Sequence, residues 1–146
     1  MTGLLLDTHV LLWWAGSPKE ISPEARLAIA SGRNPLLFSY ASIWELNIKI
    51  SRGRLVLPES TEIMLQRARC HSLPITVEHI EATGTLPHHH GDPFDRMLIA
   101  QAMADRLTLV TRDRDIRKYD VPVITAERPL LPFRVVMLEH SYFCGL

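Results

Sequence analysis

The sequence has few of the features that mark disulfide-rich, membrane or exported proteins. Among its 146 residues are only two cysteines, Cys70 and Cys144, whose spacing is neither metal-like nor disulfide-like and suits a reducing cytoplasm. No apolar run reaches the roughly 18 residues that a transmembrane helix requires. The N-terminal segment has no basic stretch, and Asp7 interrupts it after three leucines, so no signal peptide is expected. We therefore expect a cytoplasmic protein without a membrane partner.

Net charge and several catalytic motifs are also absent. The 16 basic and 16 acidic residues cancel, so any contact with nucleic acid must come from a local patch and not from a global basic field. The sequence contains neither a glycine-rich phosphate loop nor a Gly-x-Ser-x-Gly elbow. Zinc is not expected, because no Cys or His pair has the usual spacing. The three histidines at 88–90 are more typical of a polar loop, although a contact with a substrate or partner stays open.

Short apolar segments alternate with helical patterns along residues 1–126, which predicts one α/β domain. Strands are expected at residues 4–6, 35–38, 74–77, 107–111 and 121–124, and helices at 9–15, 23–30, 40–52, 59–71, 78–83 and 93–106. This alternation predicts a three-layer α/β/α fold with a central, mostly parallel sheet. The last strand is expected at an edge, because Pro122 lacks an N–H. Residues 127–146 are interpreted as a C-terminal extension of unclear role.

Four acidic residues stand at or beside the edges of these apolar segments: Asp7, Glu45, Asp95 and Asp113. Asp7 directly follows the first strand, and Asp113 follows the clearest strand by two residues. Ligand sites of parallel sheets lie beyond such carboxyl ends. Carboxylates gathered there would repel one another by about 4 kcal/mol per close pair, unless some are protonated or a cation lies among them. Oxygen ligands select Mg²⁺ or Mn²⁺, which indicates metal-assisted chemistry on a phosphate.

Two of these acids also have structural interpretations within their own helices. Asp7 can be the N-cap of the following helix. Glu45 can be a surface residue paired with Lys49, four positions later. The helix around Glu45 is apolar on most sides, however, which leaves room for a partly buried Glu45 that faces a site. Basic residues near the acids can form a phosphate-contacting rim or simply be solvated: Lys49, Arg52, Arg96 and Arg112.

The other two acids each have an acidic neighbour that can take the structural role. Asp92 can cap a helix in which Asp95 occupies the first turn, and that turn would place Asp95 at the end of the sheet. Asp115 is positioned to cap a short turn at residues 116–119, which leaves Asp113 for chemistry. We therefore assign Asp95 and Asp113 to the site and keep Asp92 and Asp115 as accessory candidates.

Taken together, four segments resemble the PIN-domain ribonucleases, and most closely the VapC-like toxins of bacterial toxin–antitoxin pairs. The matching segments are LLDTH at residues 5–9, SIWE at 42–45, HGDPFDRMLIAQA at 90–102 and LVTRD at 109–113. The resemblance implies a PIN fold whose carboxylate pocket contains Asp7, Glu45, Asp95 and Asp113. The accompanying hypothesis is that Asp7 and Asp95 bind Mg²⁺ or Mn²⁺ directly, and that the metal activates water against an RNA phosphodiester.

The resemblance also implies partners. It implies a homodimer, an RNA substrate and inhibition by a small cognate antitoxin of the VapB type. Two alternatives stay open, namely a catalytically silent scaffold that acts through antitoxin binding and a structure-specific DNA nuclease with the same pocket. Four like charges in one place argue against the scaffold, because binding alone does not require them.

Overall fold

A five-stranded parallel sheet forms the centre of the protein. The computed structural model describes residues 2–126, so the predicted extension at 127–146 lies outside the described residues. The strands are β1 (Leu4–Leu6), β2 (Leu36–Ser39), β3 (His71–Leu73), β4 (Thr108–Thr111) and β5 (Val123–Thr125), in the order β3-β2-β1-β4-β5. Every neighbouring pair is parallel. The predicted parallel sheet and the edge position of the last strand are both confirmed.

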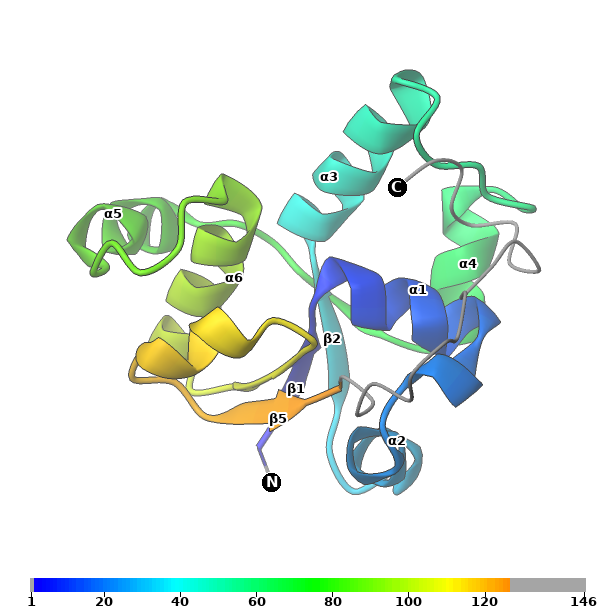
Figure 1. Ribbon diagram of the computed structural model, residues 1–146, viewed down its shortest axis with the longest axis horizontal. Helices are drawn as coiled ribbons and strands as arrows, with labels where there is room; N and C mark the ends of the chain where they lie inside the picture. Colours follow the sequence, from blue (N-terminus) through cyan, green and yellow to red (C-terminus); the bar gives the residue numbers. More distant parts are fainter. Residues whose placement is uncertain (1, 127–146) are drawn as a thin grey trace, which may run out of the picture.

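Helices cover both faces of this sheet. They are α1 (Thr8–Gly16), α2 (Pro23–Ala30), α3 (Tyr40–Ser51), α4 (Thr61–Ala68), α5 (Val77–Thr85) and α6 (Pro93–Ala104), with short 3₁₀ helices η1 (Pro18–Glu20) and η2 (Arg114–Lys118). Helices α1, α2 and α4 lie on one side of the sheet and α5 and α6 on the other (Figure 1). The three-layer prediction is confirmed. None of the helices within residues 2–126 is long and apolar enough to cross a membrane.

Two separate hydrophobic cores lie on the two faces of the sheet, and the first strand contributes to both. Leu4 and Leu6 belong to one buried cluster, whereas Leu5 belongs to the other, as expected from the alternation of side chains along a strand. The three leucines are at most 2% exposed. Strand β1 is therefore fixed from both sides, and its carboxyl end is a rigid place from which to present Asp7.

One region differs from the sequence prediction. Helix α4 ends at Ala68 because Arg69 has a left-handed backbone with φ 53°, and the chain enters β3 two residues later. The expected strand at 74–77 is wrong. Thr76 is the N-cap of α5, since its Oγ1 accepts a hydrogen bond from the His79 N–H while its own N–H donates to His79 Nδ1. This capping box starts a helix where β-branched residues suggested a strand.

Candidate active site

Asp7 occupies the carboxyl end of the central strand β1 and begins α1. Its Oδ1 accepts a hydrogen bond from the Val10 N–H at 2.8 Å, and its Oδ2 accepts one from Thr111 Oγ1 at 2.5 Å. Burial raises the pKa of Asp7, although both hydrogen bonds and the charge of Arg112 act in the opposite direction. The structural role as N-cap is confirmed. The second oxygen is nevertheless held at the edge of the sheet, beside the end of β4.

Glu45 approaches the same edge from α3. Its Oε1 accepts a hydrogen bond from Thr8 Oγ1 at 2.6 Å, and that hydroxyl lies 3.0 Å from Ser42 Oγ. Its Oε2 forms the ion pair with Lys49 that the i,i+4 spacing predicted, with an N···O distance of 3.3 Å. Only 12% of the Glu45 side chain is exposed. Because Thr8 directly follows Asp7, this hydrogen bond fixes Glu45 next to the first acid.

Asp92 caps α6, as the sequence predicted, and Asp95 lies in the first turn of this helix. Asp92 Oδ1 accepts from the N–H groups of Phe94, at 2.8 Å, and Asp95, at 3.3 Å, so Asp92 is the N-cap. The Asp95 carboxyl has no described capping hydrogen bond of this kind. Burial, together with the charges of Asp92, Asp7 and Glu45, raises the pKa of Asp95 to about 7, although the charge of His90 acts in the opposite direction. The acids from β1, α3 and α6 therefore lie within electrostatic reach of one another.

Asp113 follows β4 and caps the next short helix. Its Oδ1 accepts from the Asp115 N–H at 2.9 Å, and its own N–H donates to Thr111 Oγ1 at 3.0 Å. The expectation that Asp115 would be the cap is wrong. Asp115 instead pairs with Lys118 at 3.1 Å on the surface, where 57% of its side chain is exposed. Asp115 therefore has a surface role in the structure. The second carboxylate oxygen of Asp113, Oδ2, takes no part in the cap.

That oxygen meets His90, a residue that the sequence interpretation left in a polar loop. His90 Nε2 lies 2.5 Å from Asp113 Oδ2 and 3.1 Å from Asp95 Oδ2. These three residues each offer one possible ligand atom, and the three atoms lie within 4.8 Å of one another. Burial lowers the pKa of His90, but the hydrogen bond with Asp113 and the charges of Asp95, Asp113 and Asp92 outweigh it and raise the pKa above its ordinary value.

A local signal in the sequence could have identified His90. Its Nδ1 accepts a hydrogen bond from the Asp92 N–H at 3.0 Å, which requires only a spacing of two residues before a helix N-cap. His88 and His89 are exposed, so the three histidines do not act together. Treating them as one unit hid the member that enters the site.

Comparisons with known proteins show the family of this chain. A family model described as PIN domain matches residues 4–122. The chain belongs to the PIN domain family. A curated relative named Ribonuclease VapC22, from Mycobacterium tuberculosis (strain ATCC 25618 / H37Rv), is 33% identical over 125 residues, which are 84% of this chain and 95% of that protein.

Solved structures show the same fold. VapBC2 from Rickettsia felis, bound to a DNA fragment from its promoter, matches with a TM-score of 0.62 at 14% identity over 85% of this chain and 98% of that chain. DNA-bound VapBC from Salmonella typhimurium matches with a TM-score of 0.61 at 17% identity, over 86% and 98%. The predicted PIN fold is confirmed.

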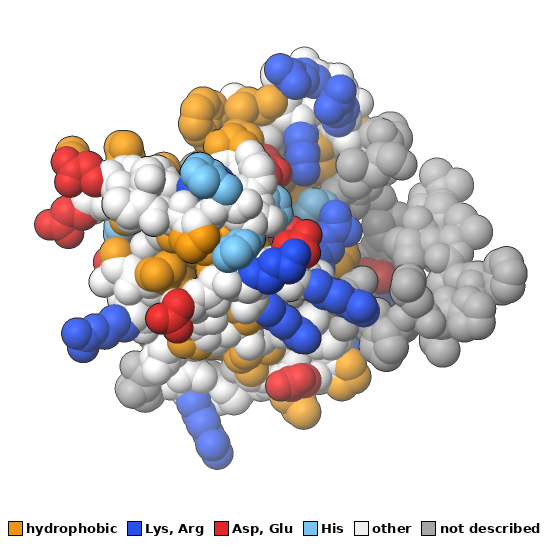
Figure 2. Space-filling model, turned by 60° about the vertical axis from the view of Figure 1, so that its left-hand side comes forward, with side chains coloured by type: hydrophobic (Ala, Val, Ile, Leu, Met, Phe, Trp, Pro, Cys, Tyr) orange, Lys and Arg blue, Asp and Glu red, His pale blue; other side chains and the backbone are white. Residues whose placement is uncertain are grey.

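Some basic side chains of this PIN domain lie near its acids. Figure 2 shows Lys and Arg side chains close to acidic and histidine side chains on one face. The guanidinium of Arg112 lies 5.8 Å from the centre of the Trp13 ring, and its charge acts on Asp7. Arg52 is exposed at the end of α3, whereas Lys49 is already paired with Glu45. Their proposed contacts with phosphates stay predictions.

Arg96 has a different role from the other basic residues. Its guanidinium donates to the backbone oxygens of Pro87, Thr83, Leu86 and His90 at 2.9, 2.9, 3.2 and 3.4 Å, and to the Tyr119 hydroxyl at 3.3 Å. Among the described residues it forms no ion pair with the neighbouring Asp95. These bonds join the end of α5, the following loop and α6, so Arg96 has a structural role, and the predicted contact with RNA is not needed to explain it.

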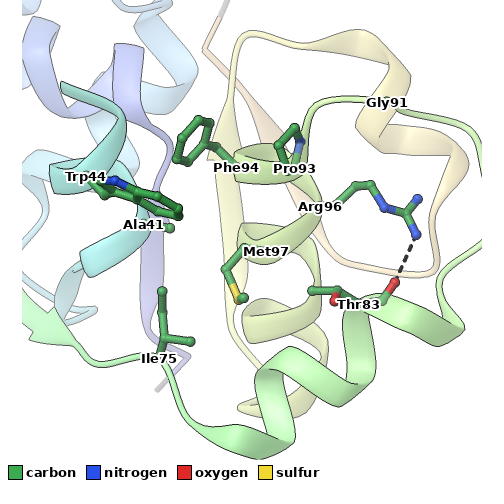
Figure 3. A pocket seen from close by; sticks show the side chains of 9 residues that line it. All are labelled: Ala41, Trp44, Ile75, Thr83, Gly91, Pro93, Phe94, Arg96 and Met97. Atoms are coloured by element: carbon green, nitrogen blue, oxygen red, sulfur yellow. Dashed lines mark hydrogen bonds between the residues drawn. The ribbon is translucent and has the colours of Figure 1, made fainter. Parts of the chain in front are cut away.

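A pocket of about 480 Å³ lies beside the acids of this PIN domain and does not contain them. Its lining comes from α3, α5, α6 and the loops before α5 and α6 (Figure 3): Ala41, Trp44, Ile75, Thr83, Gly91, Pro93, Phe94, Arg96 and Met97. Trp44 and Phe94 meet edge to face, with ring centres 5.4 Å apart. Because this lining is mostly apolar and has no carboxylate, the pocket itself does not offer the oxygen ligands that a hard cation prefers.

Proposed function

We propose that this PIN domain is a metal-dependent endoribonuclease and the toxin component of a toxin–antitoxin pair. The observation that carries the proposal is the convergence of Asp7, Glu45, Asp95 and Asp113 on one edge of the sheet, with pKa values of Asp7 and Asp95 raised by burial. The curated relative is named a ribonuclease, which supports RNA as the substrate.

The donor set fits a hard divalent cation. Carboxylates that are buried beside one another are costly when charged, and a cation among them removes this cost. We assign Asp7 and Asp95 as direct ligands of Mg²⁺ or Mn²⁺, with Glu45 and Asp113 completing the shell directly or through water. When bound, such an ion lowers the pKa of a water molecule and offsets charge on a phosphate.

The residues of the pocket then have separate tasks in hydrolysis. The oxygen of a water molecule forms a bond to phosphorus and that water loses a proton to solvent, while the bond to the 3′ oxygen breaks and the 3′ oxygen takes up a proton from solvent. Thr111 and the Val10 N–H orient Asp7, and Thr8 orients Glu45. Exposed Arg52 and Arg112 hold the phosphates on either side of the cut, together with Lys49 where Glu45 releases it.

The proposal extends to partners and location. The Rickettsia and Salmonella structures are VapBC assemblies, and a further match is a toxin–antitoxin complex from Klebsiella pneumoniae, 18% identical with a TM-score of 0.59. By analogy, we assign this chain a small VapB-like antitoxin and a homodimeric state. Its low cysteine content is consistent with the cytoplasm. Residues 1–126 are the proposed nuclease domain, and residues 127–146 the proposed extension.

The experiment that tests the function is metal-dependent cleavage by antitoxin-free protein. Structured RNAs and DNAs of matched sequence are incubated with the full chain in EDTA, in Mg²⁺ and in Mn²⁺. We expect cleavage of RNA only, and only with metal. Cleavage of DNA at an equal rate would favour the DNA nuclease. A folded protein that binds Mn²⁺ but cuts nothing across a panel of transfer, messenger and ribosomal RNAs would favour the silent scaffold.

Removing the hydroxyl of Thr8 is expected to weaken the site without disturbing the fold. Thr8→Val keeps the shape of this buried side chain but takes away the hydrogen bond to Glu45. Groups that orient metal ligands typically contribute about 10–100-fold to metal affinity or activity, so a loss of this size is expected. Mn²⁺ titration and cleavage kinetics measure it. Thr8→Ser retains the hydroxyl and is the matched control; a loss as large as that of Thr8→Val would contradict this role.

A further inference from the structure

We propose that His90 is a positioning residue of the acidic pocket, which donates one N–H to Asp113 and Asp95 and holds these two carboxylates together. The proposal rests on the proposed function, because it assigns His90 to the support of metal-binding oxygens. His90 lies in the loop between α5 and α6, Asp95 in the first turn of α6, and Asp113 two residues after the end of β4. A single ring therefore connects three segments.

Hydrogen bonds on both ring nitrogens determine where the hydrogen of His90 is placed. The Asp92 N–H lies 3.0 Å from Nδ1 and can only donate, so Nδ1 must be an acceptor without a hydrogen. A neutral ring then carries its hydrogen on Nε2. That nitrogen faces Asp113 Oδ2 at 2.5 Å and Asp95 Oδ2 at 3.1 Å. The Nε2–H therefore donates mainly to Asp113 and is shared with Asp95.

The same arrangement argues against His90 as a metal ligand, although its nitrogen lies within 4.8 Å of an oxygen from each aspartate. A ligand nitrogen needs a free lone pair. Moving the hydrogen from Nε2 to Nδ1 would set Nδ1–H against the Asp92 N–H, so that two donors faced each other. A doubly protonated ring also carries a hydrogen on Nε2 and offers no lone pair there. His90 is thus suited to orienting ligands, a role in which hydrogen-bond partners change metal affinity about 10–100-fold.

The backbone on both sides of this ring is anchored. The Tyr119 hydroxyl accepts from the His90 N–H at 2.9 Å and from the His89 N–H at 3.2 Å. Arg96 donates to the His90 carbonyl at 3.4 Å and to the Pro87 carbonyl at 2.9 Å. The imidazole is therefore presented from a loop that is fixed at several points, as a positioning group requires.

Two substitutions separate the functions of the two ring nitrogens. In His90→Gln the amide NH₂ lies near the place of Nε2 and still donates to Asp113. In His90→Asn the amide oxygen lies near the place of Nδ1 and still accepts from Asp92, but the side chain reaches neither Asp113 nor Asp95. We measure the Mn²⁺ dissociation constant of the full chain by electron paramagnetic resonance. It is expected to rise about 10–100-fold in His90→Asn and less than about threefold in His90→Gln. His88→Asn changes an exposed neighbour and is the matched control.

Several outcomes would overturn this role for His90. Equal losses in both variants, with folding confirmed by circular dichroism, would show that the donor at Nε2 is not the important group. A loss in His90→Gln alone would assign the role to the Asp92 hydrogen bond. A ¹⁴N coupling from an imidazole bound directly to Mn²⁺ would make His90 a ligand. Unchanged affinity in both variants would reject the positioning role while leaving a working ribonuclease intact. A wild-type chain that binds no Mn²⁺ would instead reject the proposed function itself, and this role with it.

Discussion

Asp95→Asn is expected to abolish metal-dependent RNA cleavage and at the same time to stabilise the metal-free protein. Asparagine keeps the size of the side chain but removes the charge that attracts the cation. Catalysis by a metal ion contributes several kcal/mol to transition-state stabilisation, so kcat/KM should fall by roughly 10³-fold or more. RNA affinity should not weaken, because one negative charge near the phosphates is lost.

The gain in stability follows from the shifted pKa of Asp95. The pKa is raised from its ordinary value of 3.8 to about 7 by burial and by neighbouring acids, so the fold favours the protonated form. The protonated Asp95 therefore contributes stability to the fold. This contribution is fully present below about pH 4 and is lost as the pH rises through 7. At pH 8 the metal-free wild type carries a charge that Asp95→Asn lacks. The variant should be more stable by a few kcal/mol.

Thermal unfolding in EDTA between pH 4 and pH 8 measures this effect, and cleavage of one RNA measures the loss of activity. The stability difference should shrink towards pH 4, and addition of Mn²⁺ should stabilise only the wild type. Asp120→Asn makes the same chemical change at an exposed position and should alter neither quantity. Full activity in Asp95→Asn would remove Asp95 from the mechanism. Equal stability of variant and wild type at pH 8 would mean that burial and the neighbouring acids do not raise the pKa of Asp95 as described.

The sequence predicts the acidic residues of this candidate site better than it predicts the residues that hold them in place. Asp7, Asp95 and Asp113 are recognisable because each follows an apolar strand or lies at the start of an apolar helix. A charged residue at such a position is unusual unless it has a specific structural or chemical role. Glu45 is harder, since its pair with Lys49 also exists. His90 was missed because its proposed role depends on a contact with Asp113, which lies 23 residues away in the sequence and meets His90 only in the fold.

The error in secondary structure has a related cause. β-Branched residues near Thr76 favour a strand, but the reciprocal hydrogen bonds between Thr76 and His79 start a helix at this place. Histidine at the third helical position is not the residue that the usual capping box would suggest. The strand propensity of these residues was therefore outweighed by a local pair of hydrogen bonds, which cannot easily be predicted from the residue types alone.

Among the substitutions proposed for this protein, Arg96→Met is expected to lower the free energy of unfolding most. The guanidinium of Arg96 satisfies four backbone carbonyls and the Tyr119 hydroxyl, and methionine replaces only the apolar part of the side chain. Hydrogen bonds to a charged group contribute about 1.5–3 kcal/mol each but do not add independently. We expect a loss of about 3 kcal/mol, which corresponds to a fall in melting temperature of roughly 10 °C.

Two further variants make this prediction specific. Arg96→Lys keeps the charge but cannot reach the same carbonyls with one ammonium group, so its loss should be intermediate. Arg33→Met removes an exposed arginine and should change the melting temperature little. A melting temperature of Arg96→Met equal to that of Arg33→Met would show that the loop is held by other contacts.

The same substitution also tests how the site depends on the loop between α5 and α6. Arg96 binds the carbonyl of His90, so without Arg96 the imidazole should lose its fixed place between Asp95 and Asp113. Mn²⁺ affinity of Arg96→Met, measured well below its melting temperature, should therefore fall together with stability, as in His90→Asn. Reduced stability with unchanged affinity would assign the anchoring of His90 to the Tyr119 hydroxyl alone, and would separate the structural role of Arg96 from the chemistry of the pocket.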